Sequence, residues 1–121
     1  MFTISVETHF RASHQVVLPD EAKEPLHEHD WQVRADVSSA RLNNIGMVMD
    51  FVRLKSMLDK ILQDICGAGL LETSFFRKNG SSAELVAQYI YQQLEPELEA
   101  DVELAGIRVV ESAGCMAKFT K

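Results

Sequence analysis

Residues 26–37 read LHEHDWQVRADV, and the alternation in this stretch decides the fold. From His27 onward the odd positions are apolar or histidine and the even positions are charged or polar, which is the two-residue period of a half-buried strand. His27 and His29 therefore share a face with Trp31, and we expect both imidazoles to point into the core. Residues 1–12 alternate in the same way, so a polar, proline-containing loop should join two strands.

The rest of the chain predicts two helices and then two more strands, because its apolar spacing changes from two residues to a helical repeat and back again. Together these elements favour an α+β fold in which a four-stranded antiparallel sheet carries two helices on one face, as a single domain over residues 1–121. The remaining expected elements are a short paired strand at Met47–Met49, a helix over 51–65 capped by Asp50, a helix from Ser81 or Ser82 to Pro96, and strands at 104–111 and 115–119.

The composition favours a protein whose partner is a small molecule. The 121 residues are 46% hydrophobic and 25% charged, which is typical of one soluble domain, and a net charge of −6 without a cluster of Lys and Arg argues against a nucleic-acid partner. No run approaches the ~18 apolar residues that cross a membrane. We expect a cytoplasmic protein, and a sheet with one uncovered face favours a homo-oligomer.

Three of the four histidines fall in phase on the apolar side of the predicted strands. His14 ends the apolar side of the first strand, His27 and His29 lie on the apolar side of the second, and His9 falls on a polar face. Imidazoles at i and i+2 of a strand project together, and a third from an adjacent strand completes the three-nitrogen set of a catalytic zinc site. The alternative is that each is a hydrogen-bonded core or surface residue, which is commoner for any single histidine.

Five segments together resemble one known family. They are FRASH (10–14), LHEHDWQV (26–33), GMVMDF (46–51), SSAELVAQYI (81–90) and VVESAGCMAKF (109–119). The pattern is similar to that of the 6-pyruvoyl tetrahydropterin synthase and 6-carboxytetrahydropterin synthase (QueD) family of pterin enzymes. The resemblance implies the T-fold, whose sheets join into a barrel in a hexamer built from two trimers. It also implies Zn²⁺ held by His14, His27 and His29, and a lyase acting on 7,8-dihydroneopterin triphosphate.

Glu111 is the second expected anchor of the site. It is in phase with Ile107 and Val109, so it should face inward, where a carboxylate needs a partner rich in donors. A pterin ring offers adjacent N–H and NH₂ groups that match two carboxylate oxygens, and the resemblance implies that Glu111 grips the pterin. Ser82 and Glu84 match other positions of the pterin pocket. For Glu84 the alternative is a capping box with Ser81 that starts the helix.

The chain also departs from the family pattern at the residues that usually transfer protons. Lys23 stands where the usual general-base cysteine is expected, and Cys66 and Gly67 stand in place of the usual Asp-His pair. A variant of the family carries a glutamate three residues before the histidine pair, and this chain reads EPLHEH, so Glu24 is the expected base. Members of that variant give 6-hydroxymethyl-7,8-dihydropterin. An exposed loop glutamate is the alternative for Glu24.

Three functions stay open at this point. The chain is either an active enzyme of the biopterin, queuosine or folate type, or a zinc-containing protein that binds a pterin or purine without converting it. In a third, structural reading the zinc holds an oligomer together, which three ligands with an open position favour less than a closed four-ligand set.

Overall fold

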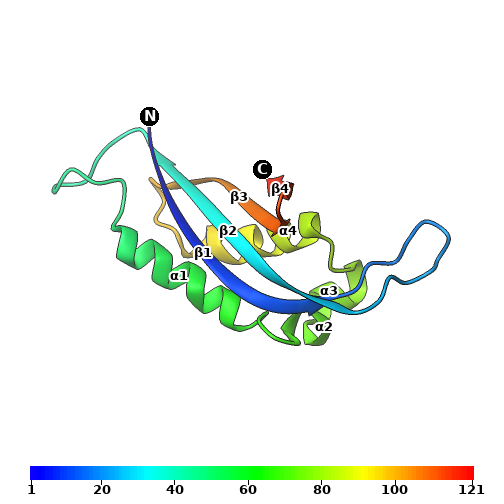
Figure 1. Cartoon of the computed structure of the whole chain (residues 1–121). Helices are drawn as coiled ribbons and strands as arrows, with labels where there is room; N and C mark the ends of the chain where they lie inside the picture. The colour runs from blue at the N-terminus through cyan, green and yellow to red at the C-terminus, as the bar shows by residue number, and fades with distance from the viewer.

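A computed structural model describes all residues, 1–121, as a twisted antiparallel sheet with helices packed on one face (Figure 1). The strands are β1 (Phe2–His14), β2 (His27–Ser39), β3 (Glu103–Ser112) and β4 (Cys115–Phe119), and they lie in the order β1-β2-β3-β4. The helices are α1 (Phe51–Gln63), α2 (Gly69–Glu72), α3 (Ser74–Asn79) and α4 (Ala83–Leu94), followed by the 3₁₀ turn η1 (Glu95–Glu97). This architecture confirms the expected α+β fold with a four-stranded antiparallel sheet.

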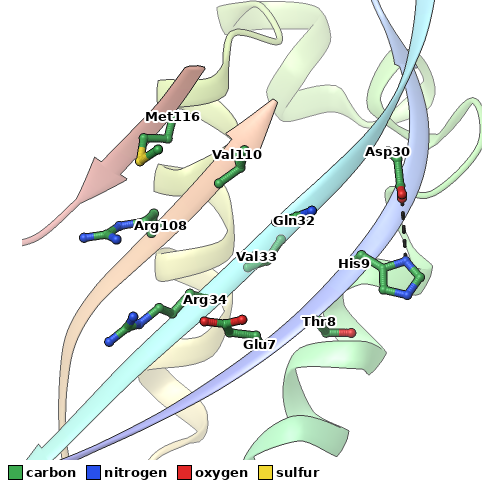
Figure 2. A pocket seen from close by; sticks show the side chains of 10 residues that line it. All are labelled: Glu7, Thr8, His9, Asp30, Gln32, Val33, Arg34, Arg108, Val110 and Met116. Carbon is green, nitrogen blue, oxygen red and sulfur yellow. Dashed lines mark ion pairs between the residues drawn. The ribbon is translucent and has the colours of Figure 1, made fainter. Parts of the chain in front are cut away.

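The core lies between the sheet and the helices because each strand buries alternate side chains. On β2, Trp31, Val33 and Ala35 are almost fully buried, and the intervening residues reach the other face. Helix α1 packs on β1, while α4 packs on β3 and β4. The opposite face of the sheet carries charged side chains, among them Arg34 and Arg108 (Figure 2). None of the helices is both long enough and apolar enough to cross a bilayer.

The two long helices begin where side-chain caps were expected. The Asp50 carboxylate accepts a hydrogen bond from the Val52 amide at 2.9 Å, and the Ser82 hydroxyl accepts one from the Leu85 amide at 3.3 Å. Since Ser82 is the cap of α4, Ser81 lies outside the helix and the capping box between Ser81 and Glu84 does not form. These caps fix the residue at which each helix begins.

The expected strand at Met47–Met49 is wrong. Both edges of β2 are occupied by β1 and β3, so no edge is left for a third partner. Residues 40–50 instead form a loop in which the Asn43 side chain accepts hydrogen bonds from the Ile45 and Met47 amides. The sequence did not predict α2 and α3, because helices of four and six residues are too short to show a repeating apolar spacing.

The segment after α1 returns to the outer edge of β1. The Gly67 amide donates to the Arg11 carbonyl at 2.7 Å, and the Ser13 amide donates to the Gly67 carbonyl at 2.9 Å. Gly67 has a φ of 61°, which glycine adopts without strain. The contact fixes the end of β1 that carries His14.

Candidate metal centre

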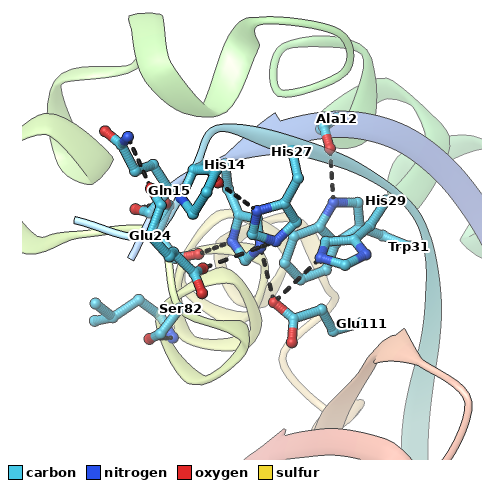
Figure 3. Close-up of polar contacts among 12 residues, drawn as sticks. Ala12, His14, Gln15, Glu24, His27, His29, Trp31, Ser82 and Glu111 are labelled. Carbon is cyan, nitrogen blue, oxygen red and sulfur yellow. Dashed lines mark hydrogen bonds and ion pairs between the residues drawn. The ribbon is translucent and has the colours of Figure 1, made fainter. Parts of the chain in front are cut away.

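Three histidines and one glutamate converge where β1, β2 and β3 come together (Figure 3). In the β1–β2 register His14 lies directly opposite His27, and Ala12 lies opposite His29. The Nε2 atoms of His14 and His27 are 2.9 Å apart. The Oε1 atom of Glu111 is 2.8 Å from Nε2 of His14 and 3.7 Å from Nε2 of His29. One ligand atom from each of the four residues lies within 4.8 Å of all the others.

A bulge in the sheet directs Glu111 to this point. In the β3–β4 pairing Val110 lies opposite Met116 and Ser112 opposite Cys115, so Glu111 is the extra residue on β3. A bulge bends the strand and re-aims the side chain it carries. The inward direction of Glu111 follows from its phase with the buried Val109, and the bulge sets where along the histidine pair the carboxylate arrives.

Hydrogen bonds on the far side of two rings fix their tautomers. Nδ1 of His14 is 2.8 Å from the Ser81 carbonyl oxygen, and Nδ1 of His27 is 2.7 Å from that of Pro25. A carbonyl oxygen only accepts, so each Nδ1 carries the hydrogen and each neutral ring keeps its lone pair on Nε2. Two lone pairs and a carboxylate oxygen therefore face one another at hydrogen-bond distance, an arrangement that needs a cation between them.

The third ring indicates which cation fits. Nε2 of His29 is buried and has no hydrogen-bond partner, which costs about 1–3 kcal/mol in a protein without a metal. Burial lowers the pKa of His29, which favours the neutral ring with an available lone pair, although the Glu111 carboxylate opposes this shift. One proton on His14 could be shared with His27 and Glu111 but leaves His29 unpaired. Three imidazole nitrogens and a carboxylate oxygen fit Zn²⁺.

Trp31 packs against the rings of His14 and His29. Its ring meets those of His14 and His29 edge-on, with centroids 4.8 and 5.6 Å apart, and its Nε1 donates to the Ala12 carbonyl at 3.2 Å. Trp31 is fully buried, so it cannot move aside without disturbing the core. Partners of this kind hold ligand rings in one orientation.

Glu24 reaches the cluster from the loop between β1 and β2. Its Oε1 atom is 3.7 Å from Nε2 of His27, and its side chain is 31% exposed, so it borders the cluster instead of pointing into solvent (Figure 3). Two hydrogen bonds hold the loop here: the Gln15 side chain donates to the Glu24 carbonyl at 2.9 Å, and the Glu24 amide donates to the Val16 carbonyl at 3.0 Å. A carboxylate in this position can accept a proton from a molecule bound at the histidines.

The other expected site residues lie apart from these contacts. Ser82 caps α4, and Glu84 is exposed in the first turn of that helix and takes part in none of the cluster's hydrogen bonds or ion pairs. His9 lies on the exposed face, 3.6 Å from Asp30. Cys66 and Cys115 are exposed. Sequence reasoning missed Ser81, because a backbone carbonyl that orients His14 leaves no mark in the residue type.

Two hollows in the surface are lined by other residues than the histidines of the cluster. One, of about 450 Å³, lies on the helix-free face of the sheet and is lined by residues including Arg34 and Arg108 (Figure 2). The other, of about 610 Å³, is bordered by Gln15 beside His14 and carries three cationic side chains. These are Lys23, Arg77 and Lys78, and no carboxylate lines that hollow although the chain has 18 acidic and 12 basic residues.

Comparison with known proteins gives one consistent family. A family model described as 6-pyruvoyl tetrahydropterin synthase matches residues 3–121. The chain is 32% identical over 124 residues to 6-carboxy-5,6,7,8-tetrahydropterin synthase of Synechocystis sp., covering 98% of this chain and 93% of that protein.

Solved structures of low identity share the fold. Caenorhabditis elegans 6-pyruvoyl tetrahydropterin synthase matches with a TM-score of 0.85 at 17% identity, over 99% of this chain and 95% of that one. A Plasmodium vivax 6-pyruvoyltetrahydropterin synthase matches with a TM-score of 0.76 at 19% identity, over 99% and 97% of the two chains. That variant is a catalytic residue mutant in which alanine replaces a glutamate.

Proposed function

The chain belongs to the 6-pyruvoyl tetrahydropterin synthase family and is an enzyme of that type, and on this premise we propose that it is a zinc-dependent pterin lyase acting on 7,8-dihydroneopterin triphosphate. The observation that carries the proposal is the convergence of three imidazole Nε2 atoms with a carboxylate, Glu24, 3.7 Å from one of them. In this proposal residues 1–121 act as one pterin-binding domain, and His14, His27 and His29 hold the metal.

The protein's own groups have distinct tasks in the proposed reaction. Zinc, when bound, supplies a Lewis acid that polarises hydroxyl and carbonyl oxygens of a substrate side chain. The carbonyls of Ser81 and Pro25 keep the rings of His14 and His27 in the tautomer that presents Nε2, and Trp31 packs edge-on against the rings of His14 and His29. Glu24 acts as the base that removes a proton from the substrate side chain.

Glutamate chemistry has support within the fold. The Plasmodium vivax enzyme is described as a catalytic residue mutant in which a glutamate is replaced, so that enzyme has a catalytic glutamate. This is consistent with a carboxylate base in place of the usual cysteine. In this chain Lys23 stands at the cysteine position and is exposed, and Cys66 is exposed at the turn after α1. Neither replaces the missing group, so Glu24 is the base that the geometry favours.

The proposed substrate fits the charges around the cluster. Glu111 can pair through both carboxylate oxygens with the adjacent donors of a pterin ring. Its side chain is 27% exposed, so one side remains open to a ligand. The carboxylate-free hollow beside His14 offers Lys23, Arg77 and Lys78 to a triphosphate. Ser82 borders the same hollow and Glu84 lies in the adjoining helical turn.

The product and the assembly are finer points of the same proposal. The similarity to the Synechocystis 6-carboxy-5,6,7,8-tetrahydropterin synthase favours a 6-carboxy product over the pyruvoyl and hydroxymethyl alternatives. The helix-free face of the sheet is solvent-exposed in a single chain. Joining sheets into a barrel, in a hexamer of two trimers, would cover it.

A second candidate function rests on the departures from the family pattern. No histidine follows His29, so the usual Asp-His relay has no counterpart on α1 or in the turn after it. A protein that keeps the metal and pterin contacts but lacks this relay would bind a pterin or purine without converting it. Turnover separates the two candidates.

The test is to incubate zinc-loaded protein with 7,8-dihydroneopterin triphosphate and separate the products by chromatography. We expect native protein to convert the substrate and Glu24→Gln to lower kcat by about 10²–10⁴-fold with unchanged zinc content, because the amide cannot accept the proton. Glu28→Gln is the matched control, since Glu28 is paired with Arg11 at 2.6 Å on the opposite face of β2.

Each result has a definite meaning. Equal kcat in native protein and Glu24→Gln removes Glu24 from the reaction. Pterin binding by native protein with no product of any of the three kinds removes the lyase and leaves the binding function.

A further inference from the structure

The metal cluster contains a fourth ligand atom that the three histidines do not require. A catalytic zinc site has three protein ligands and an open position, whereas four protein ligands close it. Here Oε1 of Glu111 lies within the same 4.8 Å set as the three imidazole nitrogens. It is closer to Nε2 of His14, at 2.8 Å, than the nitrogens of His14 and His27 are to each other, at 2.9 Å.

The contact between Glu111 and His14 is not an ordinary hydrogen bond. Nδ1 of His14 donates to the Ser81 carbonyl, so a neutral ring has no hydrogen on the Nε2 atom that faces the carboxylate. His14 is fully buried, and two acceptor atoms at this distance repel each other. A cation bound by both atoms turns the repulsion into coordination.

We propose that Glu111 is the fourth ligand of the metal in the substrate-free protein and that the incoming pterin displaces it. This inference rests on the proposed function, because it assigns a second state to the residue proposed to grip the pterin. The two states exclude each other. Pairing with the pterin ring uses both carboxylate oxygens, and Oε1 is held at the cluster in the substrate-free structure.

The consequence is a site that stays closed until the correct ligand arrives. A side chain that carries only hydroxyls or carbonyls meets a metal with no vacant position. A pterin ring draws Glu111 away and opens that position next to its own side chain. Recognition of the ring and access to the metal are thereby coupled through one carboxylate.

The test compares zinc affinity and the visible absorption of the cobalt(II)-substituted protein in three forms: native, Glu111→Gln and Glu24→Gln. Glu24→Gln is the matched control, because it removes the same charge 3.7 Å from Nε2 of His27 but lies outside the four-residue set. We expect Glu111→Gln to weaken zinc binding by about a hundredfold or more and to shift the cobalt bands. Glu24→Gln should weaken binding by less than about tenfold and leave the bands in place.

Displacement is tested in the native cobalt protein by adding 7,8-dihydroneopterin, which has the pterin ring without phosphates. Binding is followed by ligand fluorescence, and we expect the cobalt bands to shift in step with it. Pterin binding without a band shift overturns displacement. Cobalt bands and zinc affinity in Glu111→Gln equal to those of Glu24→Gln overturn the fourth ligand while leaving the three-histidine site intact. Native protein that binds neither metal refutes the site itself and the proposed function with it.

Discussion

Replacing His29 by alanine should change the stability of the protein only when metal is present. With zinc at a hundred times its Kd, binding to the folded state alone adds about 2.7 kcal/mol to the free energy of unfolding. At about 4 °C per kcal/mol for a chain of this size, the Tm of native protein should rise by about 10 °C over that of chelated protein. His29→Ala should lose most of that rise.

The chelated forms provide the contrast, because two effects of the substitution oppose each other there. Removing the buried, unpartnered Nε2 of His29 recovers about 1 kcal/mol, while losing the edge contact with Trp31 costs a similar amount. Chelated His29→Ala should therefore unfold within about 1 kcal/mol of chelated native protein. The assay is thermal unfolding by circular dichroism, with excess zinc and with chelator.

His9→Ala is the control, since His9 lies on the exposed face and outside the cluster. It should keep the full zinc-dependent rise in Tm. A rise in His29→Ala equal to that of native protein would refute the role of His29 as a ligand. A large loss of stability in chelated His29→Ala would refute the view that the unpartnered Nε2 of His29 destabilises the protein without metal.

Three further predictions concern the scaffold. Trp31→Phe should lower the free energy of unfolding in urea by about 2–3 kcal/mol, because it leaves a cavity and removes the donor to the Ala12 carbonyl. Burial, followed by the hydrogen bond to a glutamate, raises the pKa of Tyr91 to about 12. Since an unfolded tyrosine titrates near pH ~10, stability from the neutral phenol is complete below that pH and is lost as pH rises toward about 12. Urea titrations across this range should show a weaker decline in Tyr91→Phe. Gly69→Ala should destabilise by about 1–3 kcal/mol, because the new Cβ would lie 2.7 Å from the Asp64 carbonyl oxygen, and an unchanged urea midpoint would contradict this.

Periodicity predicted the sheet and the convergence of the histidines because both depend on which face a residue occupies. The two-residue alternation put His27 and His29 on the buried side with Trp31, and the antiparallel register then brought His14 opposite His27. The same argument directed Glu111 inward. Strand β4 was predicted with its observed bounds, since Gly114 and the following apolar run mark its start.

Features that depend on pairing between distant segments were beyond such reasoning. The strand expected at Met47–Met49 has the right composition, but the edges of β2 are already taken. The bulge at Glu111 arises from the β3–β4 register and so could not be read from β3 alone. The carbonyl of Ser81 orients His14 across 67 positions of sequence, and any residue type would supply it.

The return of Gly67 to the outer edge of β1 limits how the sheet can grow. The bonds to Arg11 and Ser13 occupy the backbone groups of that edge nearest His14, and only the portion from Phe2 to about residue 10 has free donors and acceptors there. Along this edge of β1, a strand from another molecule can pair over about 30 Å at most. Intermolecular pairing then stops short of the histidines, so one glycine keeps aggregation through this edge away from the histidine cluster.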